Sequence, residues 1–327
     1  MASTYASMTA FGSYVPSRVL NNQDLEQMVE TSDEWIVRRT GIRERRIVAN
    51  HEYTSDLCAA AVADLMKHHH VDLATIDLII VATQTPDYGF PSTAAQLQHR
   101  LGIPHTAAAF DLSAACAGFT YGVHLASRLI EARAHHRALV IGADTMSRIT
   151  DYTDRSTCIL FGDGAGAVII EAEHRERPSI IATHFTTDGS GGQHVYRSGL
   201  SQEMNGQRLL GDGYTVQNGR EVYRWAVTQV SEGIGHLLRS SGMSSEELDW
   251  FVPHSANMRM IESICERSGL PLDRTLTSME WYGNTSAASI PLALTLAIRD
   301  GRPRAGQTIL MYGFGAGLVA CGLIIRL

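Results

Sequence analysis

Short apolar runs rich in β-branched residues alternate along the chain with amphipathic stretches that carry helix-capping residues. This alternation is typical of buried strands connected by helices, and it predicts an α/β fold. The predicted strands are Asp77–Gln84, Ala107–Leu112, Ala138–Ala143, Ala165–Ala172, Leu248–Pro253, Thr308–Gly313 and Leu318–Arg326. The predicted helices are a segment from a Thr31–Glu34 capping box to about Gly41, then Ser92–Gly102, Cys116–Ala132, Gly219–Ser241, Ser255–Gly269 and about Thr285–Gly301, where Pro291 forces a late start or a kink.

A weak internal repeat runs through these elements. Residues 76–81 match residues 248–253 at an offset of 172, and each run precedes a loop and a helix that ends at a glycine. Residues 139–142 match residues 310–313 at an offset of 171, and each precedes a glycine turn and an apolar strand. The repeat predicts two similar halves, residues 1–175 and 176–327, which share an extensive core because no low-complexity linker divides them.

The C-terminal stretch is apolar enough to raise the question of a membrane span. A run of 21 uncharged residues separates Arg304 from Arg326, and this length could cross a bilayer. Within the run, four glycines follow the polar residues Gln307 and Thr308, so two buried strands joined by a glycine turn are expected instead. The N-terminal residues show neither a cationic region nor an unbroken apolar region of a signal peptide. We therefore expect a cytoplasmic protein with no membrane partner.

Charge and cysteine content exclude further classes of function. The 327 residues include 27 Lys and Arg and 34 Asp and Glu, which gives a net charge of −7. An acidic chain is not expected to bind nucleic acid, because phosphate binding requires clustered cations. The five cysteines are widely spaced and form no C-x-x-C pair, which argues against a disulfide framework or a zinc site. We expect neither a metal nor a resident cofactor.

Three residues at strand-to-helix junctions are candidates for chemistry. Cys116 lies among small residues at a predicted helix start, where the helix dipole is expected to lower the pKa of the thiol. His254 and Asn284 occupy two further junctions, and an offset of 168 makes Asn284 the counterpart of Cys116 in the repeat. Two chemistries remain open. In a cysteine hydrolase, the Asn orients the His that deprotonates the Cys; in a decarboxylative condensation, His and Asn both donate hydrogen bonds to an enolate oxygen.

Two other patterns are discounted. The glycine-rich runs Gly162–Gly166 and Gly313–Gly317 precede predicted strands, whereas a loop that binds phosphate must open a helix. The three histidines His68–His70 fall at a predicted helix end without acidic or cysteine ligands at a useful spacing, so a solvated helix end is expected there.

Several stretches in the right order resemble the bacterial β-ketoacyl-acyl-carrier-protein synthase III family, whose members are condensing enzymes with the thiolase fold. They are Thr31–Arg45, Ala115–Phe119, Phe161–Gly166, Pro253–Asn257 and Gly283–Ala288, within a similarity that runs from Gly12 to the C-terminus. The resemblance implies two similar halves, each with a mixed sheet and helices, in a layered αβαβα arrangement. It also implies an acyltransferase that moves an acyl group from acyl-CoA to a cysteine and condenses it with malonyl-acyl carrier protein, releasing CO₂.

The same resemblance implies a role for each candidate. Cys116 is the acylated nucleophile, and His254 and Asn284 polarise the malonyl thioester carbonyl. The backbone N–H groups of Cys116 and Ala316 form the oxyanion hole, although the family usually has glycine at the position of Ala316, so the turn there must tolerate a Cβ. Further residues are implied to bind coenzyme A and pantetheine, namely Thr31, Trp35, Arg39, Arg155 and Asn257, with the adenine between Trp35 and Arg155. The implied acyl pocket consists of Phe90, Met146 and Phe161. The implied docking residues for the acidic carrier protein are Arg224 and Arg259.

Two expectations concern assembly and substrate choice. Phe90 resembles the residue that closes the acyl pocket of a neighbouring subunit, which implies a homodimer. The stretch Asp249–Glu266 looks most like the subtype of Gram-positive bacteria that make branched-chain fatty acids, which implies a primer such as isobutyryl-, isovaleryl- or 2-methylbutyryl-CoA. Relatives use Cys, His and Asn for other condensations, so a synthase or acyltransferase of secondary metabolism is one alternative. A Cys-His-Asn thioester hydrolase is the alternative from a different class.

Overall fold

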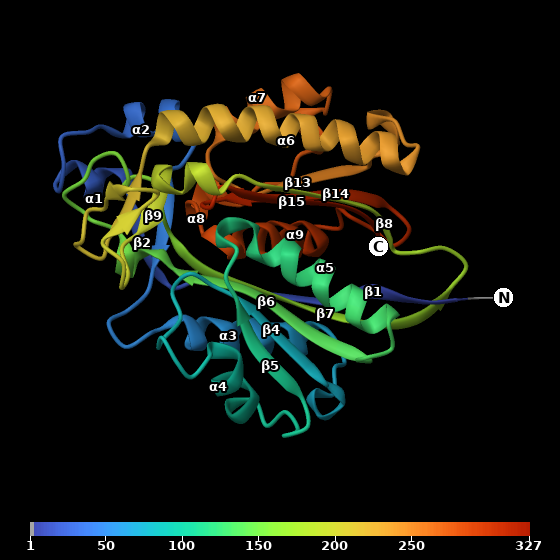
Figure 1. Ribbon diagram of the computed structural model, residues 1–327. Helices are drawn as coiled ribbons and strands as arrows, with labels where there is room; N and C mark the ends of the chain where they lie inside the picture. Colours follow the sequence, from blue (N-terminus) through green and yellow to red (C-terminus); the bar gives the residue numbers. More distant parts are fainter. Residues whose placement is uncertain (1–2) are drawn as a thin grey trace.

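The computed structural model describes residues 3–327 and contains two main sheets (Figure 1). The first has the strand order β1-β7-β6-β4-β5 and the second the order β13-β14-β15-β8. The strands of the first sheet are β1 (Ser3–Tyr14), β4 (Leu78–Ala82), β5 (Ala108–Leu112), β6 (Arg137–Thr145) and β7 (Asp163–Arg175), and those of the second are β8 (Ile180–Thr187), β13 (Trp250–Pro253), β14 (Thr308–Gly315) and β15 (Val319–Arg326). Three two-stranded sheets pair β2 (Arg18–Asn21) with β3 (Glu44–Ile47), β9 (Val195–Arg197) with β12 (Thr215–Gln217), and β10 (Glu203–Met204) with β11 (Gln207–Arg208).

Helices form the layers between and around the two sheets (Figure 1). The helices are α1 (Asn22–Glu26), α2 (Asp33–Thr40), α3 (Thr54–His68), α4 (Thr93–Arg100), α5 (Gly118–Glu131), α6 (Gly219–Ser241), α7 (Met258–Ser268), α8 (Met279–Tyr282) and α9 (Ser289–Arg299). Helices α3 and α4 cover the outer face of the first sheet, α5 and α9 lie between the sheets, and α6 covers the second sheet with α7 packed beside it. A hydrophobic core fills each space between layers. The predicted αβαβα arrangement is confirmed.

The second sheet repeats the pairing of the first. In the first sheet, β1–β7 and β7–β6 are antiparallel and β6–β4 is parallel; in the second, β8–β15 and β15–β14 are antiparallel and β14–β13 is parallel. Where the first sheet continues into β5, the second has only an isolated parallel bridge between Phe251 and Thr275. The predicted similarity of the two halves is therefore visible in their topology.

Each of the seven predicted strands coincides with an observed strand, and α6 has the predicted bounds. Three long elements were not predicted, namely β1, β8 and α3. Strand β1 consists largely of Ser, Thr, Ala and Tyr and contains no apolar run, so its place beside β7 comes from tertiary pairing rather than from its own hydrophobicity. Strand β8 lies at the edge of its sheet and is only partly buried.

Three predicted helix starts were wrong, each for a local reason. The N-cap of α2 is Ser32 rather than Thr31, because the Ser32 side chain accepts the Trp35 N–H at 3.2 Å. Helix α7 begins after Asn257, whose side chain accepts the Met260 N–H at 2.9 Å, and not at Ser255. Cys116 lies in a 3₁₀ turn, η2 (Ala115–Ala117), that precedes α5. Pro291 was predicted to cause either a late helix start or a kink, and α9 does start late, at Ser289.

The apolar C-terminal stretch is a hairpin. Strands β14 and β15 pair antiparallel along their whole length, with Gly315 opposite Val319, so the prediction of two strands joined by a glycine turn is confirmed. The run Gly162–Gly166 was predicted to precede a strand, but β7 begins at Asp163, so most of the run lies inside the strand. It opens no helix, as predicted. Among residues 3–327, no helix is both long and apolar enough to span a bilayer.

Candidate active site

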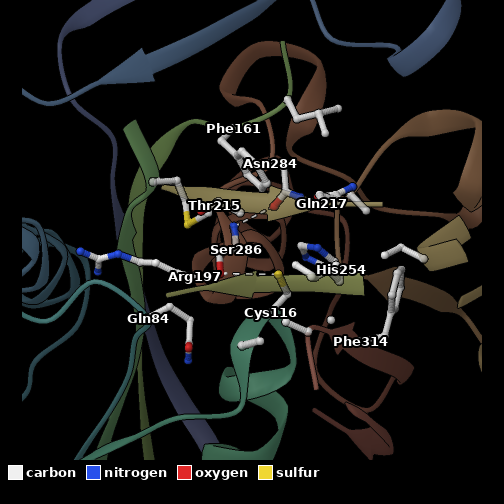
Figure 2. Close-up of a pocket in the computed structure, with 18 of the residues that line it drawn as sticks. Gln84, Cys116, Phe161, Arg197, Thr215, Gln217, His254, Asn284, Ser286 and Phe314 are labelled. Atoms are coloured by element: carbon white, nitrogen blue, oxygen red, sulfur yellow. Dashed lines mark hydrogen bonds between the residues drawn. The ribbon is translucent and has the colours of Figure 1, made fainter. Parts of the chain in front are cut away.

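A cavity of about 380 Å³ brings Cys116, His254 and Asn284 together (Figure 2). Cys116 comes from η2 in the first half, whereas His254 follows β13 and Asn284 follows α8 in the second half. The short strands β9 and β12 contribute Arg197, Thr215 and Gln217 to the wall of this cavity. The three residues predicted from separate junctions thus line one cavity.

Cys116 is held in a tight turn. The preceding residue, Ala115, has a left-handed backbone with φ of 47°, and the Cys116 thiol donates a hydrogen bond of 3.6 Å to the Ser286 hydroxyl. Burial raises the pKa of the thiol to about 12, and the Ser286 hydroxyl only partly opposes this effect. The prediction of a lowered pKa was wrong, because loss of water outweighs the helix dipole when the cysteine lies before the helix in a closed pocket.

His254 is buried and neutral. Its side chain exposes 2% of its surface, and burial lowers its pKa to about 3. The Nδ1 atom lies 2.7 Å from the Ser289 hydroxyl, so Nε2 is the ring nitrogen left for the cavity. The ring of Phe314 packs edge-on against the imidazole, with centroids 5.2 Å apart. These contacts fix the ring in one orientation.

Asn284 is fixed on both its backbone and its side chain. Its N–H donates to the Leu160 carbonyl at 2.8 Å, and its carbonyl accepts the Gly162 N–H at 3.0 Å. Its side-chain Oδ1 accepts the Ser286 N–H at 2.9 Å. Because the amide oxygen is used in this way, the Nδ2 group is left as a hydrogen-bond donor for the cavity.

The offset of 168 that paired Cys116 with Asn284 is corrected by the structure. The counterpart of η2 is a second 3₁₀ turn, η7 (Ser286–Ala288), which lies 171 residues further along. Both turns begin at a residue with a left-handed backbone, Ala115 with φ of 47° and Ser286 with φ of 52°. Cys116 therefore corresponds to Ala287, and Asn284 precedes the second turn.

The end of β14 closes the cavity beside the thiol. A Cβ placed on Gly315 would lie 3.0 Å from the Cys116 Cβ and N atoms, so this glycine permits the close approach of the two segments. Ala316 also lines the cavity, and it is not among the residues of the described chain with a left-handed backbone. Its Cβ therefore causes no backbone strain there, and the departure from glycine is accommodated.

An outer cavity of about 560 Å³ leads from the surface toward this site. Trp35, Arg39 and Arg259 line it, and Asn257 lines both the outer and the inner cavity. Leu160, Gln217 and Met260 are also common to the two cavities. These shared walls mark a route from the surface to Cys116.

The other predicted substrate-binding residues lie around this route. The Arg155 guanidinium stacks on the Trp35 ring at 4.2 Å, which leaves no room for a base between them, so an adenine sandwich requires the two side chains to separate. Thr31, just before α2, has a buried hydroxyl without a hydrogen-bond partner in the described chain.

Some of the predicted acyl-pocket and docking residues line the two cavities of the site, and others lie away from them. Met146 and Phe161 line the inner cavity, whereas the Phe90 ring is 90% exposed and lies outside that cavity. Arg259 lies at the outer cavity, whereas Arg224 lines a separate groove on α6 and pairs with Glu221. Arg224 and Arg259 therefore border different hollows of the surface.

Several residues of the inner cavity were not predicted from the sequence. Gln84, Arg197, Thr215, Gln217, Ser286 and Phe314 all line it. Ser286 follows Asn284 in a small-residue turn and could have been suspected. Arg197, Thr215 and Gln217 lie on short strands in a polar region that carries no periodic signal.

The two-sheet architecture, with a cysteine, a histidine and an asparagine lining one cavity, is that of the thiolase-like class of condensing enzymes. Two models described as 3-oxoacyl-[acyl-carrier-protein] synthase III match residues 110–189 and, for its C-terminal part, residues 238–327. The chain belongs to the β-ketoacyl-acyl-carrier-protein synthase III family. It is accordingly an acyltransferase that performs a condensation in fatty acid biosynthesis.

The relatives agree over almost the entire chain. β-Ketoacyl-acyl-carrier-protein synthase III 2 of Bacillus cereus is 54% identical over 98% of this chain and 97% of its own, and the Bacillus subtilis protein of the same name is 53% identical over 98% of both. The crystal structure of the synthase III from Thermus thermophilus superposes with a TM-score of 0.94 at 42% identity, covering 98% of this chain and 99% of its own.

Proposed function

We propose that Cys116 takes an acyl group from acyl-CoA and that the acyl-enzyme then condenses with malonyl-acyl carrier protein, releasing CO₂ and giving β-ketoacyl-acyl carrier protein. The observation that carries this proposal is the convergence of a thiol and two hydrogen-bond donors on one cavity. The side chains and backbone donors of the chain are sufficient for this chemistry, so we propose no metal and no resident cofactor. Coenzyme A and the carrier pantetheine enter as substrates.

In the first step, the Cys116 sulfur attacks the thioester carbonyl, and the backbone N–H groups of Cys116 and Ala316 stabilise the oxyanion. The close approach of Gly315 to the Cys116 backbone supports this pairing of donors. The thiol proton leaves with the coenzyme A thiol. Since burial raises the pKa of Cys116 to about 12, the sulfur carries its proton before a substrate is bound.

In the second step, His254 and Asn284 donate to the enolate oxygen that forms as malonyl loses CO₂. The Ser255 N–H donates to the Ser289 hydroxyl at 3.3 Å, and with this hydroxyl donating in turn to His254 Nδ1, the hydrogen of the neutral imidazole resides on Nε2. A neutral His254 is favoured because burial lowers its pKa to about 3. Two fixed donors stabilise developing negative charge without reorganising.

The outer cavity is the proposed entrance for both substrates. Trp35 and Arg155 bind the adenine after separating from each other, Arg39 contacts the phosphates, and Thr31 and Asn257 contact the pantetheine arm. The three arginines Arg39, Arg220 and Arg259 line this mouth, which gives a chain of net charge −7 a local basic surface for an acidic carrier protein. Arg224, four residues after Arg220 on α6, borders the separate groove and is proposed as a second docking residue there.

We propose a branched primer such as isobutyryl-, isovaleryl- or 2-methylbutyryl-CoA and an acyl pocket bounded by Met146 and Phe161. Phe90 completes the pocket of a second subunit in a homodimer. Two observations support the dimer: the Phe90 ring is 90% exposed, and β5 forms an open edge of the first sheet. Residues 1–175 and 176–327 are the two proposed domains, and the sheet changes between β7 and β8 support this boundary.

The proposal is tested by mixing the enzyme with isobutyryl-CoA and malonyl-carrier protein and determining the mass of the product on the carrier. We expect a branched β-ketoacyl group and one CO₂ released for each group formed. Free isobutyric acid without a new carrier-bound product would contradict the proposal. A competition between isobutyryl-CoA and acetyl-CoA in the same mixture tests the primer separately.

A further inference from the structure

The two 3₁₀ turns pack on the opposite halves of the molecule. Turn η2, which carries Cys116, packs on β14, and η7 packs on β6. Both contacts depend on glycine: a Cβ on Gly313 would lie 2.8 Å from the Ala117 Cα, and a Cβ on Gly142 would lie 2.2 Å from the Ala287 carbonyl oxygen. Gly142 and Gly313 are 171 residues apart, the same offset that relates the two turns. The catalytic turn thus has a counterpart with the same packing.

The two packing sites differ at one position. Where the catalytic site has Gly315 beside Cys116, the counterpart has Asp144, again at an offset of 171. The Asp144 side chain is fully buried and forms no ion pair with a Lys, Arg or His of residues 3–327. An isolated buried carboxylate is costly unless several donors satisfy it, so its hydrogen bonds define what it does.

The donors to Asp144 come from both halves. Its Oδ1 atom accepts the Thr83 hydroxyl at 3.1 Å, the Gln84 N–H at 2.7 Å and the Thr85 hydroxyl at 3.0 Å. Its Oδ2 atom accepts the Ala287 N–H of η7 at 3.2 Å. One oxygen is therefore held by the loop after β4, and the other holds the start of η7.

This second contact lies next to the hydrogen bond that orients Asn284. The N–H groups of Ser286 and Ala287 are consecutive at the start of η7, where the backbone has no partner of its own. The first N–H binds Asn284 Oδ1 at 2.9 Å and the second binds Asp144 Oδ2. A displacement of η7 would move both groups and would release the Asn284 amide.

We propose that Asp144 is a positioning residue that fixes η7 and, through the Ser286 N–H, aims the Asn284 amide at the enolate oxygen. The proposal rests on the role of Asn284 given above. It assigns Asp144 chiefly to the condensation step, because the Ala287 contact lies next to the hydrogen bond that orients Asn284. The Cys116 thiol also reaches η7, through the longer 3.6 Å contact with the Ser286 hydroxyl, so a smaller effect on acylation is expected.

The test variant is Asp144→Asn. The amide oxygen can still accept from Thr83, Gln84 and Thr85, but the NH₂ group then faces the Ala287 N–H, so two donors oppose each other. Thr83→Val is the matched control, because it removes one donor to the same carboxylate, together with the acceptor of the Thr85 N–H, and leaves the Ala287 contact in place. Three quantities are measured: the thermal midpoint, the rate of Cys116 acylation by isobutyryl-CoA, and the single-turnover rate of condensation from enzyme acylated beforehand.

We expect Asp144→Asn to slow condensation about 10- to 100-fold, the range for a displaced catalytic group, and to slow acylation by a clearly smaller factor, because Cys116 contacts η7 only through the 3.6 Å hydrogen bond to Ser286. Thr83→Val should lower the thermal midpoint while both rates stay within about 3-fold. The inference is overturned if Asp144→Asn leaves condensation unchanged, slows both steps equally, or is matched by Thr83→Val. If Asp144→Asn does not fold, Asp144→Glu replaces it in the same measurements. The added methylene is expected to displace η7 while the charge is retained, so the same selective loss of condensation is expected.

Asn284→Ala, measured in parallel, separates the two proposals. If Asn284→Ala leaves condensation intact, the role of Asn284 itself is wrong. If Asn284→Ala abolishes condensation and Asp144→Asn does not affect it, only the inference about Asp144 is wrong.

Discussion

The Asn284 amide oxygen accepts the backbone N–H of Ser286 at 2.9 Å, and this contact, taken with that of the His254 ring, favours one of the two chemistries that the sequence left open. In a cysteine hydrolase of the Cys-His-Asn kind, the amide oxygen accepts from the histidine and orients it. Here that oxygen accepts from Ser286, the His254 Nδ1 atom pairs with Ser289 at 2.7 Å, and the described residues show no hydrogen bond between the Asn284 and His254 side chains. This arrangement favours the proposed role of Asn284 and His254 as two separate donors in a condensation.

Removing either donor is expected to stop the second step and leave the first. His254→Ala and Asn284→Ala should lower the rate of condensation from acylated enzyme by about 10²–10³, since a preorganised donor is lost. Acylation of Cys116 should persist in both variants, measured by the mass of the intact protein. A variant that condenses normally once acylated, but acylates slowly, would instead indicate that its residue serves the cysteine.

Replacing the nucleophile is expected to stop both steps. Cys116→Ser should show no acylation by acyl-CoA and no overall synthesis, because a hydroxyl at its normal pKa is a far weaker nucleophile without a base to activate it. Cys265→Ser is a suitable control, since Cys265 lies on α7 and does not line the cavity. Synthesis retained in Cys116→Ser at a rate near that of wild type would show that another residue carries the acyl group.

The sequence predicted the strands that bear the site better than it predicted the site's interior. The runs before His254 and after Gly162 are strongly apolar, so their strands and the turns beside them were predictable. The start of α7 was missed because Ser255 and Asn257 can both cap a helix, and only the observed contact with Met260 selects Asn257. The pKa of Cys116 was mispredicted because burial is a tertiary property that a helix start does not reveal.

Charge reversal at the mouth of the outer cavity should affect the carrier protein selectively. Arg259 lines this cavity and forms no ion pair within residues 3–327, so Arg259→Glu is expected to raise the KM for malonyl-carrier protein several-fold at low salt, with little change in the KM for acyl-CoA. Arg302→Glu, at an exposed loop where Arg302 pairs with Asp300, is the control. An unchanged carrier KM in Arg259→Glu would place the docking surface elsewhere.

The buried His254 is expected to make stability depend on pH in a defined window. Burial lowers its folded-state pKa from 6.5 to about 3, so between these values the unfolded chain binds a proton that the folded chain does not. Its contribution is therefore complete above pH 6.5 and is lost as the pH falls toward 3, with a slope of at most about 1.4 kcal/mol per pH unit.

The comparison for this prediction is His254→Gln, which keeps a polar side chain without the titration. Urea unfolding of both proteins at several pH values between 4 and 7 should give a shallower fall of the unfolding free energy in the variant. Equal slopes in the two proteins would show that His254 is not buried in its neutral form.

The central claim is that Cys116 holds the acyl group that is then condensed, and a chase of the acyl-enzyme tests it most directly. Wild-type enzyme is incubated with isobutyryl-CoA, freed of excess substrate and digested, and the peptide containing Cys116 is examined for the acyl mass before and after malonyl-carrier protein is added. We predict one acyl group, located on Cys116, that disappears as an equal amount of β-ketoacyl-carrier protein forms. An acyl group on another residue, or its release as free acid when malonyl-carrier protein is added, would contradict the account.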